Sequence, residues 1–198
     1  MRTFSGTRPA TFGRHSLEAA CRAVVSSASS GRTVTLADGS ELALRPIGEQ
    51  DLDALIRFHE HLSPESVHNR FFGLHPHLSV RESRAFVTVD GRQRMAFILV
   101  DRGRIVAVGR YEGLEDQESA EVAFVVADDL QRHGLGTVLL RVLAEYARGA
   151  GYQRFVAQVL SSNTAMREVF AGSGLSPVFK RHQGVTEVEL DLRSVEVV

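Results

Sequence analysis

Residues 121–137 read Glu-Val-Ala-Phe-Val-Val-Ala-Asp-Asp-Leu-Gln-Arg-His-Gly-Leu-Gly-Thr. Residues 120–126 are mostly apolar, which is typical of a buried β-strand. A loop with Gly134 and Gly136 follows, and glycine lets the backbone come close to a ligand. This stretch therefore predicts a strand that runs through a glycine-containing loop into a helix.

The helix that leaves this loop is expected over residues 136–149. Its apolar residues fall on one side: Val138, Leu139, Val142, Leu143 and Tyr146. The first turn of a helix offers free N–H donors and the positive end of the helix dipole. Loop and helix start together form a site suited to a pyrophosphate, and Arg132 adds a positive charge.

Two other phosphate-binding loops fit this segment less well. A P-loop requires a lysine that the segment lacks, and a dinucleotide fingerprint requires a third glycine where Leu139 stands. Taken alone, the spacing of Gln131, Gly134 and Gly136 is a weak signal. An ordinary turn between a strand and a helix stays open as the alternative.

The rest of the chain alternates between strand-like and helix-like patterns. A hairpin is expected over residues 33–46, with its turn at Asp38-Gly39. The other expected elements are a helix over 48–62, helices that start at Ser63-Pro64 and at Val80, strands over 94–100, 105–111 and 120–126, the helix over 136–149, a strand over 155–160, a helix over 163–171, and strands over 177–180 and 185–190. This order predicts an α/β fold with a mixed β-sheet flanked by helices.

The length of 198 residues favours a single domain, which we place at residues 32–198. Residues 1–31 are expected to form a flexible N-terminal extension with one short helix over 16–26. A net charge of -1 gives no argument for nucleic acid or an anionic membrane as a partner. The single cysteine, Cys21, and the lack of a long apolar run favour a cytoplasmic protein.

The segment Gln131–Gly136 resembles the cofactor motif of the GNAT superfamily of N-acetyltransferases, in which a glutamine or arginine precedes two spaced small residues after a central strand. Downstream, Asn163 and the pair Gly174-Leu175 are similar in spacing to a second segment of that family. The resemblance runs from about residue 41 to residue 190. It implies the GNAT fold, in which two central strands of the mixed sheet splay apart.

A narrower resemblance links the chain to the bacterial Pat-type protein lysine acetyltransferases. It rests on Leu44–Ile47 followed by Asp51, and on Leu62–Ser66, Arg70–Gly73 and Ala120–Phe124. In that group the glutamate at the position of Glu121 is the proposed general base. The resemblance implies a lysine on a protein, for example an acyl-CoA synthetase, as the acceptor. Some relatives carry an added cyclic-nucleotide domain, which the short extension is not expected to contain.

The resemblance also implies acetyl-CoA as co-substrate and assigns the residues that bind it. They are the backbone of Phe124, Val125 and Val126, the loop residues Gln131, Arg132, His133, Gly134, Leu135, Gly136 and Thr137, and Asn163. In the wider family the pantetheine arm pairs with strand backbone in the gap between the splayed strands. The backbone of residues 124–126 is therefore expected to be partly unpaired.

Phe170 departs from the family pattern, because many relatives have a tyrosine there as general acid. A tyrosine acid at this position is excluded, so the coenzyme thiolate leaves unassisted or is protonated by water or another group. Leu130 replaces a residue that is commonly aromatic, which we interpret as a packing difference.

A base is required because a lysine amine has an unperturbed pKa of about 10.4 and is mostly protonated at neutral pH. Glu121 is expected to take the proton, directly or through a water, and a backbone N–H near Val126 to stabilise the oxyanion. Pairing of Glu121 with a nearby arginine is the structural alternative. A small-molecule amine acetyltransferase and a non-catalytic acyl-CoA-binding regulator are the alternative functions.

No metal is expected to bind. His59 and His61 lie two apart on a helix and do not share a face, and His75 and His77 lie in a loop without a partner motif. The four acidic residues within 114–121 either attract a basic acceptor or form a solvated hairpin tip.

Overall fold

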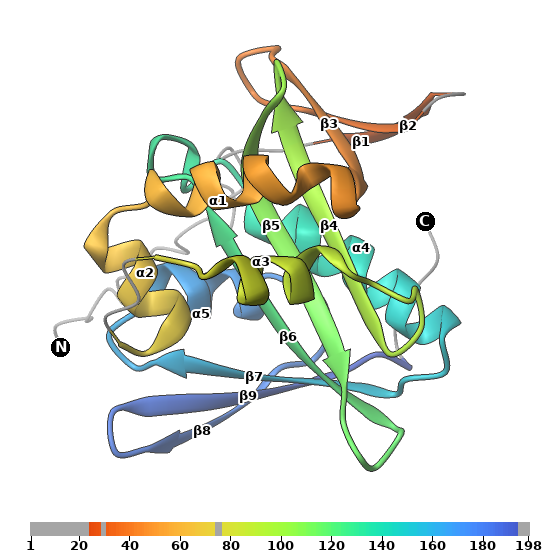
Figure 1. Cartoon of the computed structure of the whole chain (residues 1–198). Helices are drawn as coiled ribbons and strands as arrows, with labels where there is room; N and C mark the ends of the chain where they lie inside the picture. The colour runs from red at the N-terminus through yellow and green to blue at the C-terminus, as the bar shows by residue number, and fades with distance from the viewer. Residues whose placement is uncertain (1–23, 29–30, 74–76, 194–198) are drawn as a thin grey trace, which may run out of the picture.

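The computed structural model describes residues 24–28, 31–73 and 77–193. In this part of the chain, nine strands form one sheet in the order β1-β2-β3-β4-β5-β6-β7-β9-β8 (Figure 1). The strands are β1 (Val24–Ala28), β2 (Gly31–Thr35), β3 (Glu41–Pro46), β4 (Arg94–Asp101), β5 (Arg104–Gly113), β6 (Ser119–Val126), β7 (Arg154–Leu160), β8 (Val178–His182) and β9 (Val185–Asp191). Neighbouring strands are antiparallel except for β6 and β7, which are parallel.

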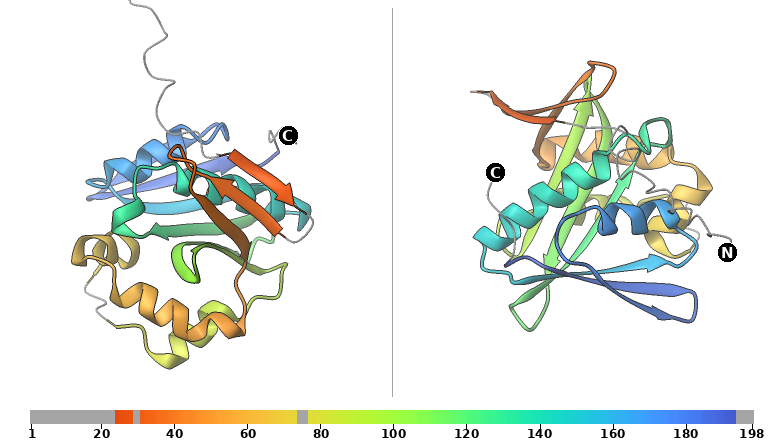
Figure 2. Two further views of the ribbon diagram at one scale, coloured as in Figure 1. Left: turned by 90° about the horizontal axis from the view of Figure 1, so that it is seen from above. Right: turned by 180° about the vertical axis from the view of Figure 1, so that it is seen from behind.

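Helices cover both faces of this sheet. They are α1 (Leu52–Glu60), α2 (Pro64–Phe71), α3 (Val80–Val87), α4 (Leu135–Gly149) and α5 (Thr164–Ala171), with short 3-10 turns η1 (Glu49–Asp51) and η2 (Asp128–Leu130). Figure 1 shows α1, α2 and α3 on one face, and the view from behind in Figure 2 shows α4 and α5 on the other. The expected α/β fold with a mixed sheet flanked by helices is confirmed.

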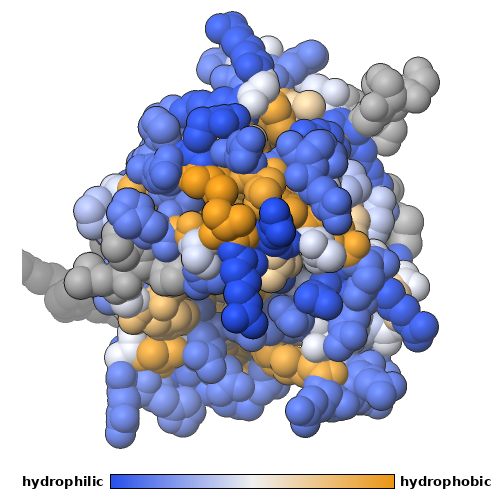
Figure 3. Space-filling view, viewed as in Figure 1, coloured by the Kyte–Doolittle hydropathy of each residue, from blue (hydrophilic) through white to orange (hydrophobic). Residues whose placement is uncertain are grey.

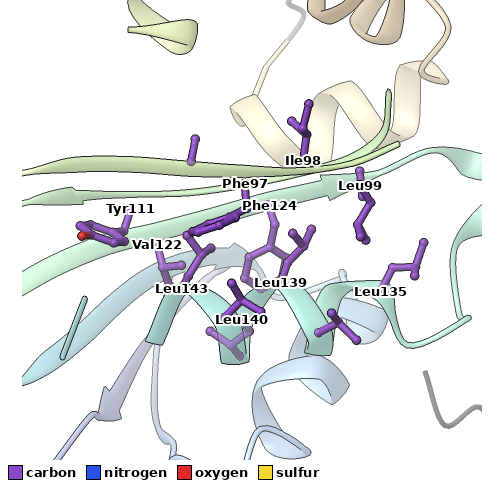
Figure 4. Packing of buried hydrophobic residues seen from close by; sticks show 14 of the residues in the cluster. Phe97, Ile98, Leu99, Tyr111, Val122, Phe124, Leu135, Leu139, Leu140 and Leu143 are labelled. Atoms are coloured by element: carbon purple, nitrogen blue, oxygen red, sulfur yellow. The ribbon is translucent and has the colours of Figure 1, made fainter. Parts of the chain in front are cut away.

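The largest part of the core lies between the sheet and α4. Leu135, Leu139 and Leu143 follow one another at intervals of four, which puts them on one face of the helix. All three are at most 1% exposed. They point toward the strands, where they meet Phe97, Leu99, Val122 and Phe124 (Figure 4). Of the residues expected on the apolar side of this helix, Tyr146 is the exception, because it is 41% exposed.

The helix starts that the sequence indicated are formed by side-chain caps. Ser63 precedes α2, and its hydroxyl accepts the N–H of Ser66 at 3.2 Å, with Pro64 at the first helical position. Ser79 caps α3 in the same way and accepts the N–H of Glu82 at 3.2 Å. These caps satisfy N–H groups that the helices themselves leave unbonded.

The N-terminal boundary differs from the one expected. The strand β1 lies inside the predicted extension and pairs with β2, so the sheet begins before residue 32. The helix expected over residues 16–26 is wrong for residues 24–26, which are extended, and its remainder lies outside the described residues. Ser and Val in this stretch suit a strand once a neighbouring strand supplies hydrogen bonds, which a local pattern does not reveal.

Candidate active site

Strands β6 and β7 separate after a short paired section. Only three residue pairs join them, namely Ser119–Arg154, Ala120–Phe155 and Glu121–Val156. The next residues of β6, 122–126, pair with β5 alone. Figure 1 shows the two strands diverging toward α2 and α5. The splay expected for the central strands is therefore present, and it begins directly after Glu121.

The main-chain N–H groups of Phe124 and Val126 face the gap between these strands. Ala127 donates its N–H to the carbonyl oxygen of Val106 at 2.8 Å, so residue 127 faces β5. In an antiparallel pair, alternate residues face the same neighbour. The β5–β6 register has no shift, so residues 123 and 125 also face β5. Residues 124 and 126 consequently direct their donors and acceptors away from it.

The loop after β6 directs further donors toward the same gap. Arg132 and Gly134 have φ angles of 66° and 80°, and this left-handed backbone turns the chain sharply into α4. Val138 donates the first helical hydrogen bond, to the carbonyl oxygen of Gly134 at 3.1 Å. The N–H groups of residues 135–137 precede that bond and are left without a partner in the helix, as at any helix start. This geometry suits an anion.

A cleft of about 380 Å³ connects the strand gap with this loop. Its volume falls in the range of small-molecule sites. Ten of the twelve predicted site residues line it: Phe124, Val125, Val126, Gln131, Arg132, Gly134, Leu135, Gly136, Thr137 and Asn163. The other two, His133 and Glu121, are not among its lining residues. His133 Nδ1 instead lies 2.8 Å from the carbonyl oxygen of Gln131.

Helix α5 forms one wall of the cleft. Ala165, Met166 and Val169 contribute to this wall. Asn163 caps the helix, because its Oδ1 accepts the N–H of Met166 at 3.0 Å. A Cβ on Gly136 would lie 3.3 Å from Val169 Cγ2, so α4 and α5 approach one another closely at this glycine. Gly136 therefore serves the packing of the two helices.

Phe170 of α5 belongs to the core. Its ring is 1% exposed and lies 5.5 Å from the ring of Phe124, centroid to centroid. The position at which many family members have a tyrosine is thus occupied here by a packing residue.

A hydrogen-bond network that the sequence analysis did not assign ties α2 to the cleft. The carboxylate of Asp128 accepts hydrogen bonds from Ser63 N (2.9 Å), Ser63 Oγ (2.6 Å) and Ser66 Oγ (2.7 Å). Gln131 Nε2 donates to Ser66 Oγ at 2.9 Å and to the carbonyl oxygen of Val126 at 3.2 Å. Burial opposes ionisation of Asp128, but the hydrogen bonds from the two serines outweigh it and lower its pKa.

The serines of this network belong to the stretch Leu62–Ser66, which carried the Pat-type resemblance without a role. The structure gives them one, since they hold the start of α2 against η2 and the end of β6. In the sequence, only the carboxylate of Asp128 pointed to such a hydrogen-bond network. The sequence does not indicate which hydroxyl groups reach that carboxylate.

Glu121 lies at the point where β6 and β7 separate. It is exposed and pairs in register with Glu112 of β5 and Val156 of β7. Side chains alternate along a strand, so Glu121 shares a face with Ala123 and Val125, on the side covered by α1, α2 and α3. Among the described residues, no arginine or lysine forms an ion pair with Glu121. The geometry therefore does not favour the alternative in which Glu121 forms an ion pair with a nearby arginine.

Two arginines that the sequence analysis left unassigned lie near Glu121. Arg70 of α2 lines the cleft and a second cavity of about 40 Å³ between the sheet and helices α1–α3. Arg110 of β5 lines the second cavity. The charge of Glu121 raises the pKa of both groups, against a larger lowering caused by their burial.

The acidic stretch before Glu121 is largely engaged with an arginine. Arg154 lies 3.6 Å from Asp116 and 3.8 Å from Glu118, and Asp116 also accepts the N–H groups of Glu118 and Ser119. These contacts favour a solvated hairpin tip over a rim that attracts basic acceptors.

In the described part of the chain, no group of three or more His, Cys, Asp or Glu side chains is arranged to hold a metal ion. His59 is buried on α1 and His61 is exposed, while His75 lies outside the described residues. None of the helices in this part of the chain has the length and apolar character needed to cross a membrane.

Comparison with known proteins supplies the family. The model of the acetyltransferase (GNAT) family matches residues 55–174. Acetyltransferase PA5475 of Pseudomonas aeruginosa is 31% identical over 144 residues, which cover 71% of this chain and 77% of that protein. Acetyltransferase Pat of Mycolicibacterium smegmatis is 32% identical over 175 residues, which cover 83% of this chain. The match spans 50% of the length of that second relative.

Solved structures agree with this assignment. The GNAT domain of S. lividans PAT has 34% sequence identity and a TM-score of 0.75, over 80% of this chain and 95% of that one. The spermidine N-acetyltransferase of Vibrio cholerae, solved with CoA and spermine, has a TM-score of 0.62 at 15% identity, which shows the fold alone. The splayed sheet, the cleft and these matches lead to one conclusion: the chain belongs to the acetyltransferase (GNAT) family and resembles its Pat-type members.

Proposed function

We propose that the protein transfers an acetyl group from acetyl-CoA to the ε-amine of a lysine on a protein acceptor. The observation that carries this proposal is the separation of β6 and β7 after Glu121, which leaves the N–H groups of Phe124 and Val126 facing the cleft. Membership of the family and the likeness to relatives named Pat support the choice of reaction and of acceptor.

The residues of the cleft fit acetyl-CoA at both of its ends. The N–H groups of residues 135–137 and the side chain of Arg132 suit the diphosphate. The backbone of Phe124 and Val126 suits the amide groups of the pantetheine arm, which pairs with β6 as an added strand. The wall formed by α5 encloses this arm from the other side.

The chemistry requires a base and a donor for negative charge. Glu121 takes a proton from the lysine ammonium, directly or through a water, and the free amine then attacks the thioester carbonyl carbon. The N–H of Phe124, the free donor of β6 nearer to Glu121, donates a hydrogen bond to the carbonyl oxygen as it becomes negative. The carbonyl oxygen of Phe124 and the N–H of Val126 are then left for the amide groups of the pantetheine arm. When the C–S bond breaks, the sulfur leaves with the electron pair as a thiolate. The proton that the attacking nitrogen loses passes through water to the thiolate, without help from residue 170.

The position of Glu121 suits a base that acts on the acceptor side. It lies at the apex of the gap, about 10 Å along the strand from Phe124 at about 3.3 Å per residue. Its side chain belongs to the face covered by α1–α3, while the diphosphate end of the cleft lies beyond Val126. Exposure of the carboxylate allows water to carry the proton onward.

The activity is tested by incubating the protein with acetyl-CoA and a cell lysate and mapping acetylated sites by mass spectrometry. We expect enrichment of particular lysines over a sample without the protein. Acetylation of free amines without any protein lysine would instead assign a small-molecule acceptor. Binding of acetyl-CoA without turnover on protein or amine panels would assign a non-catalytic regulator.

The role of Glu121 is tested by Glu121→Gln, with Glu112→Gln as the matched control. Glu112 lies directly opposite Glu121 on the same face of the sheet. A general base contributes roughly 10²–10⁴-fold, so we expect kcat/KM of Glu121→Gln to fall by about that factor while acetyl-CoA affinity is kept. A loss below about tenfold, or an equal loss in both variants, would remove Glu121 from the mechanism.

A further inference from the structure

Arg110 on β5 has a buried donor without an acceptor. Its side chain is only 14% exposed, and its Nη1 donates to no described residue. Its Nη2 lies 3.5 Å from the carboxylate of Glu112, which is itself 56% exposed. The guanidinium carbon lies 4.6 Å from the centre of the Phe86 ring. A buried guanidinium held by one distant carboxylate and one aromatic ring has unused donors, and leaving them unbonded costs free energy.

Arg70 on α2 brings a second guanidinium to the same place. Among the described residues it forms no ion pair, and its guanidinium carbon lies 5.0 Å from the centre of the Phe71 ring. Burial, together with the positive charge of Arg110, lowers the pKa of Arg70 to about 10. The fold therefore holds two like charges near one another, and among the described residues the carboxylate of Glu112 is the only one within ion-pair distance of either.

The two arginines line one cavity beside the proposed reaction centre. This cavity has a volume of about 40 Å³, and its other walls come from the buried imidazole of His59 on α1 and from apolar side chains of the helices, their connections and the sheet. Figure 3 shows apolar residues between α1 and α3 on this face, with hydrophilic ones around them. Arg70 and Val125 line both this cavity and the cleft. Val125 stands between Phe124 and Val126, whose N–H groups face the cleft.

Glu121 is not the missing partner of these arginines. Its charge acts on both of them, but no oxygen of Glu121 lies within the 4.0 Å of an ion pair. Since Glu121 is exposed at the apex of the gap, it stays available for the acceptor amine. Among the described residues, Nη1 of Arg110 still has no hydrogen-bond acceptor and Arg70 still has no ion pair.

We propose that Arg70 and Arg110 form a subsite for a carboxylate of the substrate, next to the reacting thioester. This proposal rests on the proposed function. The cavity lies next to an acyl group only if the cleft binds an acyl-CoA. Guanidinium groups match carboxylates in geometry and keep their charge when buried. The cavity has room for about three water-sized groups, which suits one carboxylate. That carboxylate is either the end of a dicarboxylic acyl group or an acidic side chain beside the acceptor lysine.

The first arm of the test compares two acyl-CoA ligands of equal chain length. Isothermal titration calorimetry measures Kd for succinyl-CoA and butyryl-CoA with the wild-type chain, Arg70→Met, Arg110→Met and the control Arg57→Met, which changes an exposed arginine of α1. If the acyl group supplies the carboxylate, wild type and Arg57→Met bind succinyl-CoA at least about tenfold more tightly than butyryl-CoA, because a charge-assisted hydrogen bond contributes that much affinity. Both other variants lose this preference.

The second arm compares acceptor peptides. Fluorescence anisotropy measures binding of a lysine peptide with glutamate beside the lysine, and of the same peptide with glutamine, to the protein saturated with CoA. If the acceptor supplies the carboxylate, the glutamate peptide binds about tenfold more tightly to wild type and Arg57→Met, and this difference disappears in the other two variants. The proposal is overturned if wild type shows no carboxylate preference in either arm, or if the preference persists in both arginine variants.

Folding of the variants is checked by thermal unfolding. The Kd for CoA itself is measured for each variant as well, because Arg70 also lines the cleft, so that a loss of affinity common to all CoA ligands is separated from a loss of the carboxylate preference. If Arg110→Met does not fold, Arg70→Met decides, and Arg110→Lys, which keeps the charge, should keep part of the preference. Both arms measure binding without turnover. If the protein acetylates nothing, the proposed function is refuted, and the binding data still show whether the subsite exists.

Discussion

The glycines between β6 and α4 illustrate how single residues shape the cleft by different physical means. Gly134 has a φ of 80°, a conformation that glycine adopts without the steric cost of a side chain. Gly136 has an ordinary helical backbone, and its missing side chain leaves space for Val169 of α5. The motif thus combines one backbone requirement with one packing requirement, and a spacing pattern cannot tell the two apart.

Replacing Gly136 by alanine tests the packing requirement. A Cβ there would lie 3.3 Å from Val169 Cγ2, so the side chain of Val169, which lines the cleft, must give way by a few tenths of an ångström. We expect Gly136→Ala to lose about 1 kcal/mol of unfolding free energy and to bind acetyl-CoA more weakly. The control is Gly149→Ala at the other end of α4, where a Cβ meets nothing within 4 Å. That variant should gain about 0.4–1 kcal/mol in denaturant unfolding. Equal effects would show that α5 imposes no constraint.

At the scale of elements, β6 is unusual because residues 122–126 of this inner strand form backbone hydrogen bonds with a neighbouring strand on one side only. A strand in the middle of a sheet normally bonds on both sides, and an unpaired N–H away from water is costly. Here α2 and α5 hold the gap open, and the Asp128 network fixes α2 to the end of β6. The separation of β6 and β7 is therefore stabilised by contacts that lie outside these two strands.

Amide hydrogen exchange tests this reading of β6. In the ligand-free protein, the amides of Phe124 and Val126 should exchange faster than those of Ala123 and Val125, which bond to β5. Acetyl-CoA at 100 times its Kd should slow the first pair and residues 135–137 by up to about 100-fold. The amides of Ala123 and Val125 should change little. Measurement by NMR resolves each amide, and slow exchange at Val126 without ligand would contradict the assigned strand parity.

At the scale of the whole molecule, α4 couples the core to the site. Its first turn supplies donors to the cleft, and its buried leucines rest on β4, β5 and β6 (Figure 4). The helix comes so close to β5 that a Cβ on Gly109 would lie 3.0 Å from Leu143 Cδ1 and 3.2 Å from Leu139 Cβ. A change far from the cleft should therefore move the donors of the cleft.

Enlarging Gly109 in steps tests this coupling. Gly109→Ala meets the flexible end of Leu143 first, while Gly109→Val adds two methyl groups where α4 has no space. We expect a loss of unfolding free energy that grows from alanine to valine and reaches about 1–3 kcal/mol, with weaker acetyl-CoA binding in the same order. Denaturant unfolding and calorimetry measure the two effects. Unchanged affinity in a destabilised valine variant would show that the position of α4 does not control the site.

Much of the fold and the contiguous part of the site followed from the sequence, because they depend on local patterns. Apolar periodicity, the helix starts at Ser63-Pro64 and at Val80, and the loop of residues 131–137 each depend on a few neighbouring residues, so their geometry can be anticipated without the fold. The strand, the turn and the helix start around this loop were predicted for this reason, since they are consecutive in the chain, while the binding role of the loop residues stays a prediction.

Only the tertiary structure decided how distant segments meet. The pairing of β1 with β2, the closeness of α5 to Gly136, and the approach of Arg70 on α2 to Arg110 on β5 each join residues that no local pattern relates. Burial decides the role of such residues. A guanidinium in water is hydrated, whereas the same group in a cavity loses free energy unless hydrogen-bond acceptors or an anion replace the water. The sequence by itself determined most of the elements and the local shape of the loop between β6 and α4, because both depend on neighbouring residues. Packing of the helices on the sheet determined what surrounds the proposed reaction centre.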